Sequence, residues 1–185
     1  MCYIKSKIAL VFLLWILTGC AHGVGDAPGN TGATFGEPNL VKISYGTADF
    51  LIKNISTQLD RENPILISSL VDINNIEQSS PLGRIMSDQI GSRLAQKGFV
   101  IMEVKLRESL YVKKQGGEFL LSRSVRDISK FHNAQAMLVG TYAQGMDRIY
   151  ISTRILSAEK GQIISSYDFS IPLTDNLEYL IAPGM

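Results

Sequence analysis

Residues 65–104 read ILISSLVDINNIEQSSPLGRIMSDQIGSRLAQKGFVIMEV, and this stretch decides the fold. It begins with an apolar run, Ile65–Ile73, whose large side chains fall on both alternating faces, as expected of a buried strand with cover on each side. It ends with a second such run, Phe99–Val104. The chain between the two runs is long enough for a helical crossover, so the sequence predicts an α/β layer rather than a β-sandwich.

The segment Gln78–Lys97 is predicted to be that crossover helix. Ser80 can cap its start, Pro81 suits the first helical position, and Gly98 supplies the stop. Gly83 is expected to permit close packing near the helix start. The apolar residues that repeat every four positions are Leu82, Met86, Ile90 and Leu94.

Further elements are predicted on both sides of this unit. Apolar spacing on one face indicates a helix over Ser44–Asp60, and a weaker helical stripe occupies Ser122–Asn133. Leu106–Leu121 is expected to be an exposed, less regular connection. Gly140 is expected to relieve a crowded strand or mark a bulge. Three strand-like runs lie at Gln135–Gln144, Arg148–Ala158 and Gln162–Ile171, and the short turns between them predict antiparallel neighbours.

The predicted fold class is therefore α/β (α+β), as a single small domain over residues 39–175. It has a mixed sheet of about five strands with two or three helices packed on it, and a C-terminal antiparallel meander. Pro172 and Pro183 suggest that residues 176–185 form an irregular tail. The 18 Lys plus Arg residues nearly balance the 17 Asp plus Glu residues, so no long-range field attracts nucleic acid.

The N-terminal end has the pattern of a bacterial lipoprotein signal. Two lysines precede the apolar run Ile8–Leu17, which is too short to span a bilayer. The residues that close it, Leu17-Thr18-Gly19-Cys20, resemble the lipobox of lipoprotein precursors. This resemblance implies that residues 1–19 are removed by cleavage between Gly19 and Cys20, and that Cys20 is acylated. An ordinary secretory signal that happens to end beside a cysteine is the alternative.

Residues 20–38 are predicted to be a flexible tether, because Gly, Pro, Ala and Thr dominate them and large apolar groups are few. A Gly-rich coil of this length has an r.m.s. span of roughly 25 Å. Ala21 follows the acylated cysteine where Asp would signal retention in the inner membrane. By resemblance to enterobacterial sorting, this favours the outer membrane.

The chain lacks the residue patterns of an enzyme. No G-x-S-x-G elbow surrounds a serine, no Gly-rich phosphate loop follows a strand, and no carboxylate pair has a recognisable glycosidase setting. His132 has no cysteine or second histidine at ligand spacing. Arg84 and Arg93 are interpreted as scattered surface charge rather than an anion site. We therefore expect neither catalysis nor a cofactor nor a metal.

Several segments, taken in order, resemble the FlgO family of flagellar outer-membrane lipoproteins. They are SSPLGRIMS at 79–87, RLAQKGF at 93–99, GEFLLSR at 117–123, LVGTY at 138–142 and IYISTR at 149–154. The resemblance implies a periplasm-facing lipoprotein at the outer-membrane end of the flagellum, with basal-body or ring proteins as partners. It also implies a fold similar to those of the curli-secretion lipoprotein and of lipoprotein activators of peptidoglycan synthases, and no catalysis.

These observations favour a structural or assembly component of the flagellum, anchored to outer-membrane lipid through Cys20. The alternative is a binding module that activates a peptidoglycan synthase or another envelope complex, and a pore-forming subunit is a third, less favoured hypothesis. Glu118, Phe119 and Arg123 lie in or beside a connection, where binding groups are often displayed, so they form a candidate contact surface. Self-association into a homo-oligomer is left open.

Overall fold

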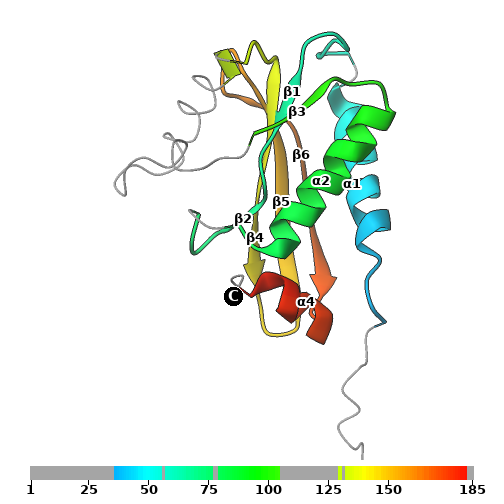
Figure 1. Cartoon of the computed structure of the whole chain (residues 1–185), viewed down its shortest axis with the longest axis vertical. Helices are drawn as coiled ribbons and strands as arrows, with labels where there is room; N and C mark the ends of the chain where they lie inside the picture. Colours follow the sequence, from blue (N-terminus) through cyan, green and yellow to red (C-terminus); the bar gives the residue numbers. More distant parts are fainter. Residues whose placement is uncertain (1–35, 56, 77–78, 105–128, 131, 183–185) are drawn as a thin grey trace, which may run out of the picture. The chain divides into compact units, whose positions relative to one another are not determined.

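The computed structural model describes residues 36–55, 57–76, 79–104, 129–130 and 132–182. In chain order, its elements are α1 (Leu40–Ile55), β1 (Ile65–Ile67), β2 (Val71–Asp72), α2 (Pro81–Gln96), β3 (Ile101–Glu103), β4 (Ala136–Gln144), β5 (Arg148–Ser157), β6 (Ile163–Pro172) and α4 (Asp175–Ile181) (Figure 1). Across these ranges, every helix is too short or too polar to cross a bilayer.

The strands form one mixed sheet in the order β3-β1-β4-β5-β6, and β2 pairs with β4 beyond the end of β1. β1 lies parallel to both β3 and β4, whereas β4, β5 and β6 form an antiparallel meander. α2 carries the chain from β2 to β3, and such a crossover is what parallel neighbours require. This architecture confirms the predicted fold class.

One face of the sheet packs against α1 and α2, and the main core lies between these two layers (Figure 1). Leu51, Ile65, Ile90, Leu94, Leu138 and Ile155 are fully buried there. A second cluster, nearer α4, includes Leu70, Leu82, Met86, Ile149 and Leu177. Each of these side chains stabilises the fold by roughly 1.5–3 kcal/mol through burial. A smaller cluster of Leu66, Met137, Val139 and Leu156 lies on the opposite face of the sheet.

The crossover helix begins and ends where its local signals predict. The Ser80 Oγ accepts a hydrogen bond from the Gly83 N–H at 3.2 Å, and Pro81 occupies the first turn. Gly98, with a φ of 88°, lies in the left-handed region just after the helix. The close-packing roles expected of Gly83 and Gly140 are also confirmed, because a Cβ at either position would clash with a backbone carbonyl oxygen.

The first helix begins and ends earlier than its predicted range, Ser44–Asp60. The Asn39 side chain accepts a hydrogen bond from the Lys42 N–H at 2.9 Å, so the helix starts at Leu40. It ends at Ile55, well before Asp60, whose carboxylate accepts hydrogen bonds from the backbone of the next turn. An apolar stripe does not reveal such caps.

The predicted strand Ile65–Ile73 is two short strands rather than one. β1 and β2 both pair with β4, but the residues that join them, 68–70, include one more residue than the facing segment of β4. The Leu70 N–H therefore donates to the Gly83 carbonyl oxygen at 3.2 Å instead of to β4. This kink brings the start of α2 against the sheet.

The expectation of an irregular C-terminal tail over residues 176–185 was wrong for most of that segment. The Thr174 Oγ1 accepts a hydrogen bond from the Leu177 N–H at 3.4 Å and caps α4. Leu177 is fully buried in the second core cluster, so this short helix is held by packing. Pro172 is the last residue of β6. Because β6 is an edge strand, a proline is tolerated there.

Candidate interaction surface on the open sheet face

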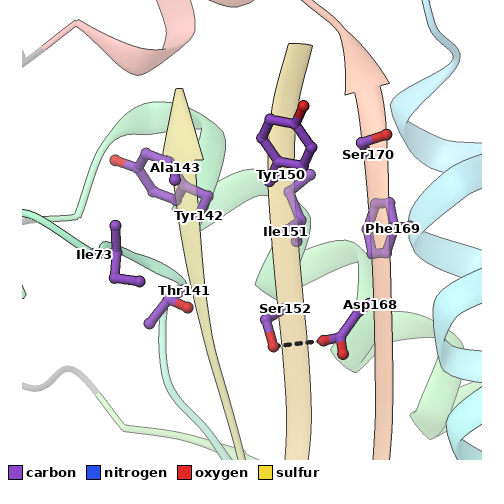
Figure 2. Close-up of a pocket in the computed structure, with 10 residues that line it drawn as sticks. All are labelled: Ile73, Thr141, Tyr142, Ala143, Tyr150, Ile151, Ser152, Asp168, Phe169 and Ser170. Atoms are coloured by element: carbon purple, nitrogen blue, oxygen red, sulfur yellow. Dashed lines mark hydrogen bonds between the residues drawn. The ribbon is translucent and has the colours of Figure 1, made fainter. Parts of the chain in front are cut away.

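The sheet face turned away from the helices carries an open hollow of about 520 Å³ over β4, β5 and β6 (Figure 2). Side chains on strands alternate between faces, and those opposite the helical core line this hollow. They are Thr141 and Ala143 on β4, Tyr150 and Ser152 on β5, and Asp168 and Ser170 on β6, with Ile73 from the segment after β2. We call this set the open-face hollow.

Two exposed apolar side chains line the open-face hollow, Ile73 beside β4 and Tyr150 on β5 (Figure 2). Tyr150 is 55% exposed and Ile73 is 57% exposed. An exposed apolar patch with a polar rim is typical of binding surfaces, so these two side chains support such a surface only together with the ordered polar groups beside them. Tyrosine is also enriched among the few residues that contribute most of the binding free energy of an interface. Its ring buries a large area while its hydroxyl remains hydrogen-bonded.

The polar side of the hollow is ordered by hydrogen bonds between strands. The Ser152 Oγ donates to the Asp168 Oδ1 at 2.5 Å (Figure 2). The Arg148 Nε donates to the Ser170 Oγ at 3.0 Å. Both contacts join β5 to β6, so these groups are held in place before any partner arrives, which lowers the entropy cost of binding.

The residues that line the hollow place a serine hydroxyl beside a carboxylate. A serine nucleophile needs a neighbouring base such as an imidazole, and none of the residues that line the hollow is a histidine or a lysine. Within the described ranges, moreover, no three His, Cys, Asp or Glu side chains gather closely enough to hold a metal ion. The surface instead offers hydroxyls, one carboxylate and an exposed ring.

Arg93, interpreted from sequence as scattered surface charge, has a structural role. Its guanidinium donates to both carboxylate oxygens of Asp49, at 3.0 and 2.9 Å, and so ties α2 to α1. Arg93 also lies over the Tyr45 ring, 5.4 Å from its centroid. The hydrogen bond from Arg93, assisted by Lys97, holds the pKa of Asp49 below its ordinary value, although burial opposes this shift.

The site residues predicted from sequence lie outside the described residues. These are Gly19 and Cys20 of the lipobox, and Glu118, Phe119 and Arg123 of the candidate contact surface. The predicted connection Leu106–Leu121 and most of the predicted helix Ser122–Asn133 lie outside them as well. The open-face hollow was not predicted. The only local signal for it was the polar alternation in residues 148–154, which read RIYISTR.

Comparisons with known proteins place the fold and the family. A sequence model described as FlgO protein matches residues 45–176. The LpoB C-terminal domain from Salmonella enterica is 15% identical, with a TM-score of 0.50, over 70% of this chain and 98% of that chain. At this identity, the likeness shows a shared fold.

Two further solved structures resemble the chain more distantly. A PelC dodecamer from Paraburkholderia phytofirmans is 12% identical, with a TM-score of 0.40, over 62% of this chain and 75% of that one. Lipoprotein GNA1162 from Neisseria meningitidis is 15% identical, with a TM-score of 0.41, over 62% and 83%. Among curated proteins, no sequence matches.

Proposed function

The chain belongs to the FlgO family, and from this premise we propose that it is an outer-membrane lipoprotein that acts as a non-catalytic assembly component of the bacterial flagellum. The observation that carries the proposal is the extent of the family match. Residues 45–176 include the whole sheet, α2 and most of α1. The lipobox at residues 17–20 supports it independently, because this anchor suits an envelope protein.

The anchor would fix the domain close to one membrane. Each buried methylene contributes about 0.8 kcal/mol to membrane binding. Several acyl chains on Cys20 would therefore keep the protein in the membrane, whereas a single chain would give only reversible attachment. The tether of residues 20–38 spans roughly 25 Å on average. The domain would therefore act at the periplasmic face of the outer membrane, beside the end of the flagellar rod.

The open-face hollow is the surface that we assign to flagellar partners, namely basal-body or ring proteins. Tyr150 and Ile73 supply apolar contact, and the ordered groups around Ser152 and Asp168 supply hydrogen bonds. Glu118, Phe119 and Arg123 remain a proposal for a second contact surface.

Deletion of the gene tests the proposal. We expect fewer or less stable flagella, altered basal rings by electron cryotomography, and slower swimming. The wild-type gene should restore all three, whereas Cys20→Ser should leave the protein out of the outer-membrane fraction and restore little. Normal flagellar number, normal rings and normal swimming in the deletion strain would rule the proposal out.

The alternative left by the sequence is a binding module that activates a peptidoglycan synthase. A domain anchored in the outer membrane has to extend far inward to meet such an enzyme, and a tether of roughly 25 Å disfavours this. One pair of experiments distinguishes the two proposed functions. Stimulation of a purified synthase by the lipoprotein, together with normal flagella in the deletion strain, would favour the alternative.

A further inference from the structure

The chain enters the domain at one end of the sheet, beside α4 and the turn between β4 and β5 (Figure 1). The Asn176 Nδ2 on α4 donates to the Glu37 Oε1 at 2.8 Å and so holds the entering chain against α4. The Leu173 N–H, just before α4, donates to the Asp147 carbonyl oxygen in the turn at 2.8 Å. We call the surface formed by residues 36–42, 145–148 and 174–182 the tether end.

Among the described residues, the two most exposed large apolar side chains both lie at the tether end. Met146 in the β4–β5 turn is 100% exposed, and Tyr179 on α4 is 71% exposed. The Gly145 N–H donates to the Arg148 carbonyl oxygen at 2.7 Å and closes the turn, so Met146 is held at its tip. Val41, in the first turn of α1, is exposed as well. Single exposed apolar residues are ordinary, but three on neighbouring elements form a candidate contact surface.

Tyr179 points away from the core. Successive residues lie about 100° apart around a helix axis, so Tyr179 lies almost opposite Leu177. Leu177 is fully buried in the second core cluster. An outward tyrosine suits a membrane interface, because its ring can contact the apolar region while its hydroxyl stays in water. The unbranched side chain of Met146 can adapt to an irregular apolar surface in the same way.

The charges of the tether end indicate which kind of lipid surface it fits. Its acidic side chains are Glu37, Asp147, Asp175 and Glu178, and its basic side chains are Lys42 and Arg148. Negative charge therefore predominates. Anionic lipids attract clusters of lysine and arginine, so they would repel this end, whereas zwitterionic headgroups would not.

We propose that the tether end rests on a zwitterionic lipid surface, with Met146 and Tyr179 among the headgroups, an inference that rests on the lipid anchor of the proposed function. The predicted tether of residues 20–38 spans roughly 25 Å on average, whereas β5 alone, with ten residues, extends about 33 Å. The opposite end of the sheet would reach the same membrane only if the tether stretched along the whole sheet. The tether end is therefore the part of the domain that meets the membrane.

Attachment makes a weak contact sufficient. A few partly inserted side chains bind a bilayer less strongly than an acyl chain, and even one acyl chain binds only reversibly. Once Cys20 is in the membrane, however, contact by the tether end is intramolecular, and a short flexible linker gives an effective concentration on the order of millimolar. The anchored domain would therefore populate a contact that the same domain without its lipid would barely make.

This orientation would turn the open-face hollow sideways. β4 ends at the tether end, β5 begins there and β6 ends there, so the strands would run away from the membrane. The face that carries the hollow would then look along the membrane surface. Tyr150 pairs with Ala143 close to the β4–β5 turn, so its ring would lie near the lipid. Partners that encircle a rod in the same plane would meet this face.

Quenching of site-specific fluorophores by spin-labelled lipids tests the orientation. Cys2 and Cys20 are the only cysteines of the chain, so in the cleaved and acylated lipoprotein an introduced cysteine is the only free thiol. Met146→Cys and Tyr179→Cys are labelled in the full lipoprotein, in phosphatidylcholine vesicles. Lys160→Cys is the matched control, because residue 160 is exposed in the turn between β5 and β6, at the opposite end of the sheet. We expect at least several-fold more quenching at residues 146 and 179 than at residue 160.

Flotation of the same vesicles reports the anchor separately. A chain that floats with the vesicles but shows equal quenching at all three positions overturns the orientation alone. A chain that does not float overturns the anchor and, with it, the orientation. The flagellar role is tested by the deletion strain, so its failure remains distinguishable from both.

Removal of the apolar side chains should release the tether end. A fluorophore at Val41→Cys reports its distance from the lipid. In the double variant Met146→Ser with Tyr179→Ser, we expect quenching at residue 41 to fall at least several-fold. Val100→Ser with Ile163→Ser is the control, because it removes two exposed apolar side chains at the opposite end of the sheet and should leave the quenching unchanged. Equal effects of the two double variants contradict the proposal.

Vesicle composition tests the kind of surface. In an equimolar mixture of phosphatidylcholine and phosphatidylglycerol at low ionic strength, we expect quenching at residues 146 and 179 to fall about two-fold or more, because the acidic side chains are repelled. Added salt should restore it by screening this repulsion. Quenching that rises with phosphatidylglycerol would show attraction to anionic lipid and contradict the zwitterionic surface.

Discussion

Gly83 and Leu70 hold the start of α2 against the sheet by direct backbone contact. The Leu70 N–H donates to the Gly83 carbonyl oxygen at 3.2 Å, and the Leu70 carbonyl oxygen occupies the space where a side chain at residue 83 would begin. Only glycine permits this approach, and the kink between β1 and β2 depends on it.

Gly83→Ala is therefore expected to destabilise the fold by at least about 1–3 kcal/mol, the usual cost of overpacking, because the obstruction is backbone rather than a flexible side chain. Urea unfolding followed by circular dichroism measures it. Gly46→Ala is the control: residue 46 is exposed on α1 with no atom near the added methyl group, so the substitution should stabilise by about 0.5–1 kcal/mol. Equal effects of the two substitutions would contradict the contact.

The free energy of unfolding should decrease at acid pH, because protonation of Asp49 weakens its contact with Arg93. The folded-state pKa of Asp49 lies below its ordinary value, mainly because Arg93 donates hydrogen bonds to it. Its contribution is complete above the unfolded pKa of about 3.9, and it is lost as the pH falls through the lower, folded value. Asp49→Asn should therefore be less stable than wild type at pH 7, and the difference should shrink toward pH 2.

Thermal unfolding across this pH range provides the measurement, with Arg93→Lys as the companion variant. Lysine keeps the charge but loses the two-point contact, so part of the pH-dependent difference should remain. If the difference in thermal stability between wild type and Asp49→Asn is constant with pH, the contact contributes no pH-dependent stability.

How much of this fold could be predicted depended on how local its determinants are. The start and end of α2 were predicted correctly, because Ser80, Pro81 and Gly98 signal them within a few residues. The division of Ile65–Ile73 into two strands follows from a mismatch with β4, a segment distant in sequence. Similarly, Arg93 and Asp49 are 44 positions apart, and no local pattern connects them.

The open-face hollow was harder to predict for the same reason. The alternation around Tyr150 shows which side chains share a face of β5, but not which face the helices leave uncovered. That choice depends on how α1 and α2 pack. Cys20 differs, because its motif is entirely local and can be recognised from the sequence alone; its acylation stays a prediction, since Cys20 lies outside the described residues.

Leu177→Ala is expected to destabilise the domain by about 2–5 kcal/mol, because it leaves a cavity at a fully buried position. The same measurement on Tyr179→Ala, which alters a side chain that is 71% exposed on the same helix, should show a change within about 0.5 kcal/mol. If both substitutions change the free energy of unfolding by similar, small amounts, residues 176–185 lie outside the core as the sequence predicted.

Tyr150→Thr should impair flagellar function without unfolding the domain. Threonine retains strand propensity, and the ring it replaces is 55% exposed, so the free energy of unfolding should change by less than about 1 kcal/mol. If the ring anchors a flagellar partner, its loss should weaken binding about tenfold or more, as truncation of an interface tyrosine commonly does. Swimming in soft agar and flagellar counts, with protein levels matched by immunoblot, would show the defect.

Tyr150→Phe separates the ring from its hydroxyl and should retain most of the function, because the apolar area is kept. Normal motility with Tyr150→Thr would remove the open-face hollow from the proposal and leave Glu118, Phe119 and Arg123 as the surface to test next. Loss of motility with both variants, at normal protein levels, would instead assign the contact to the hydroxyl.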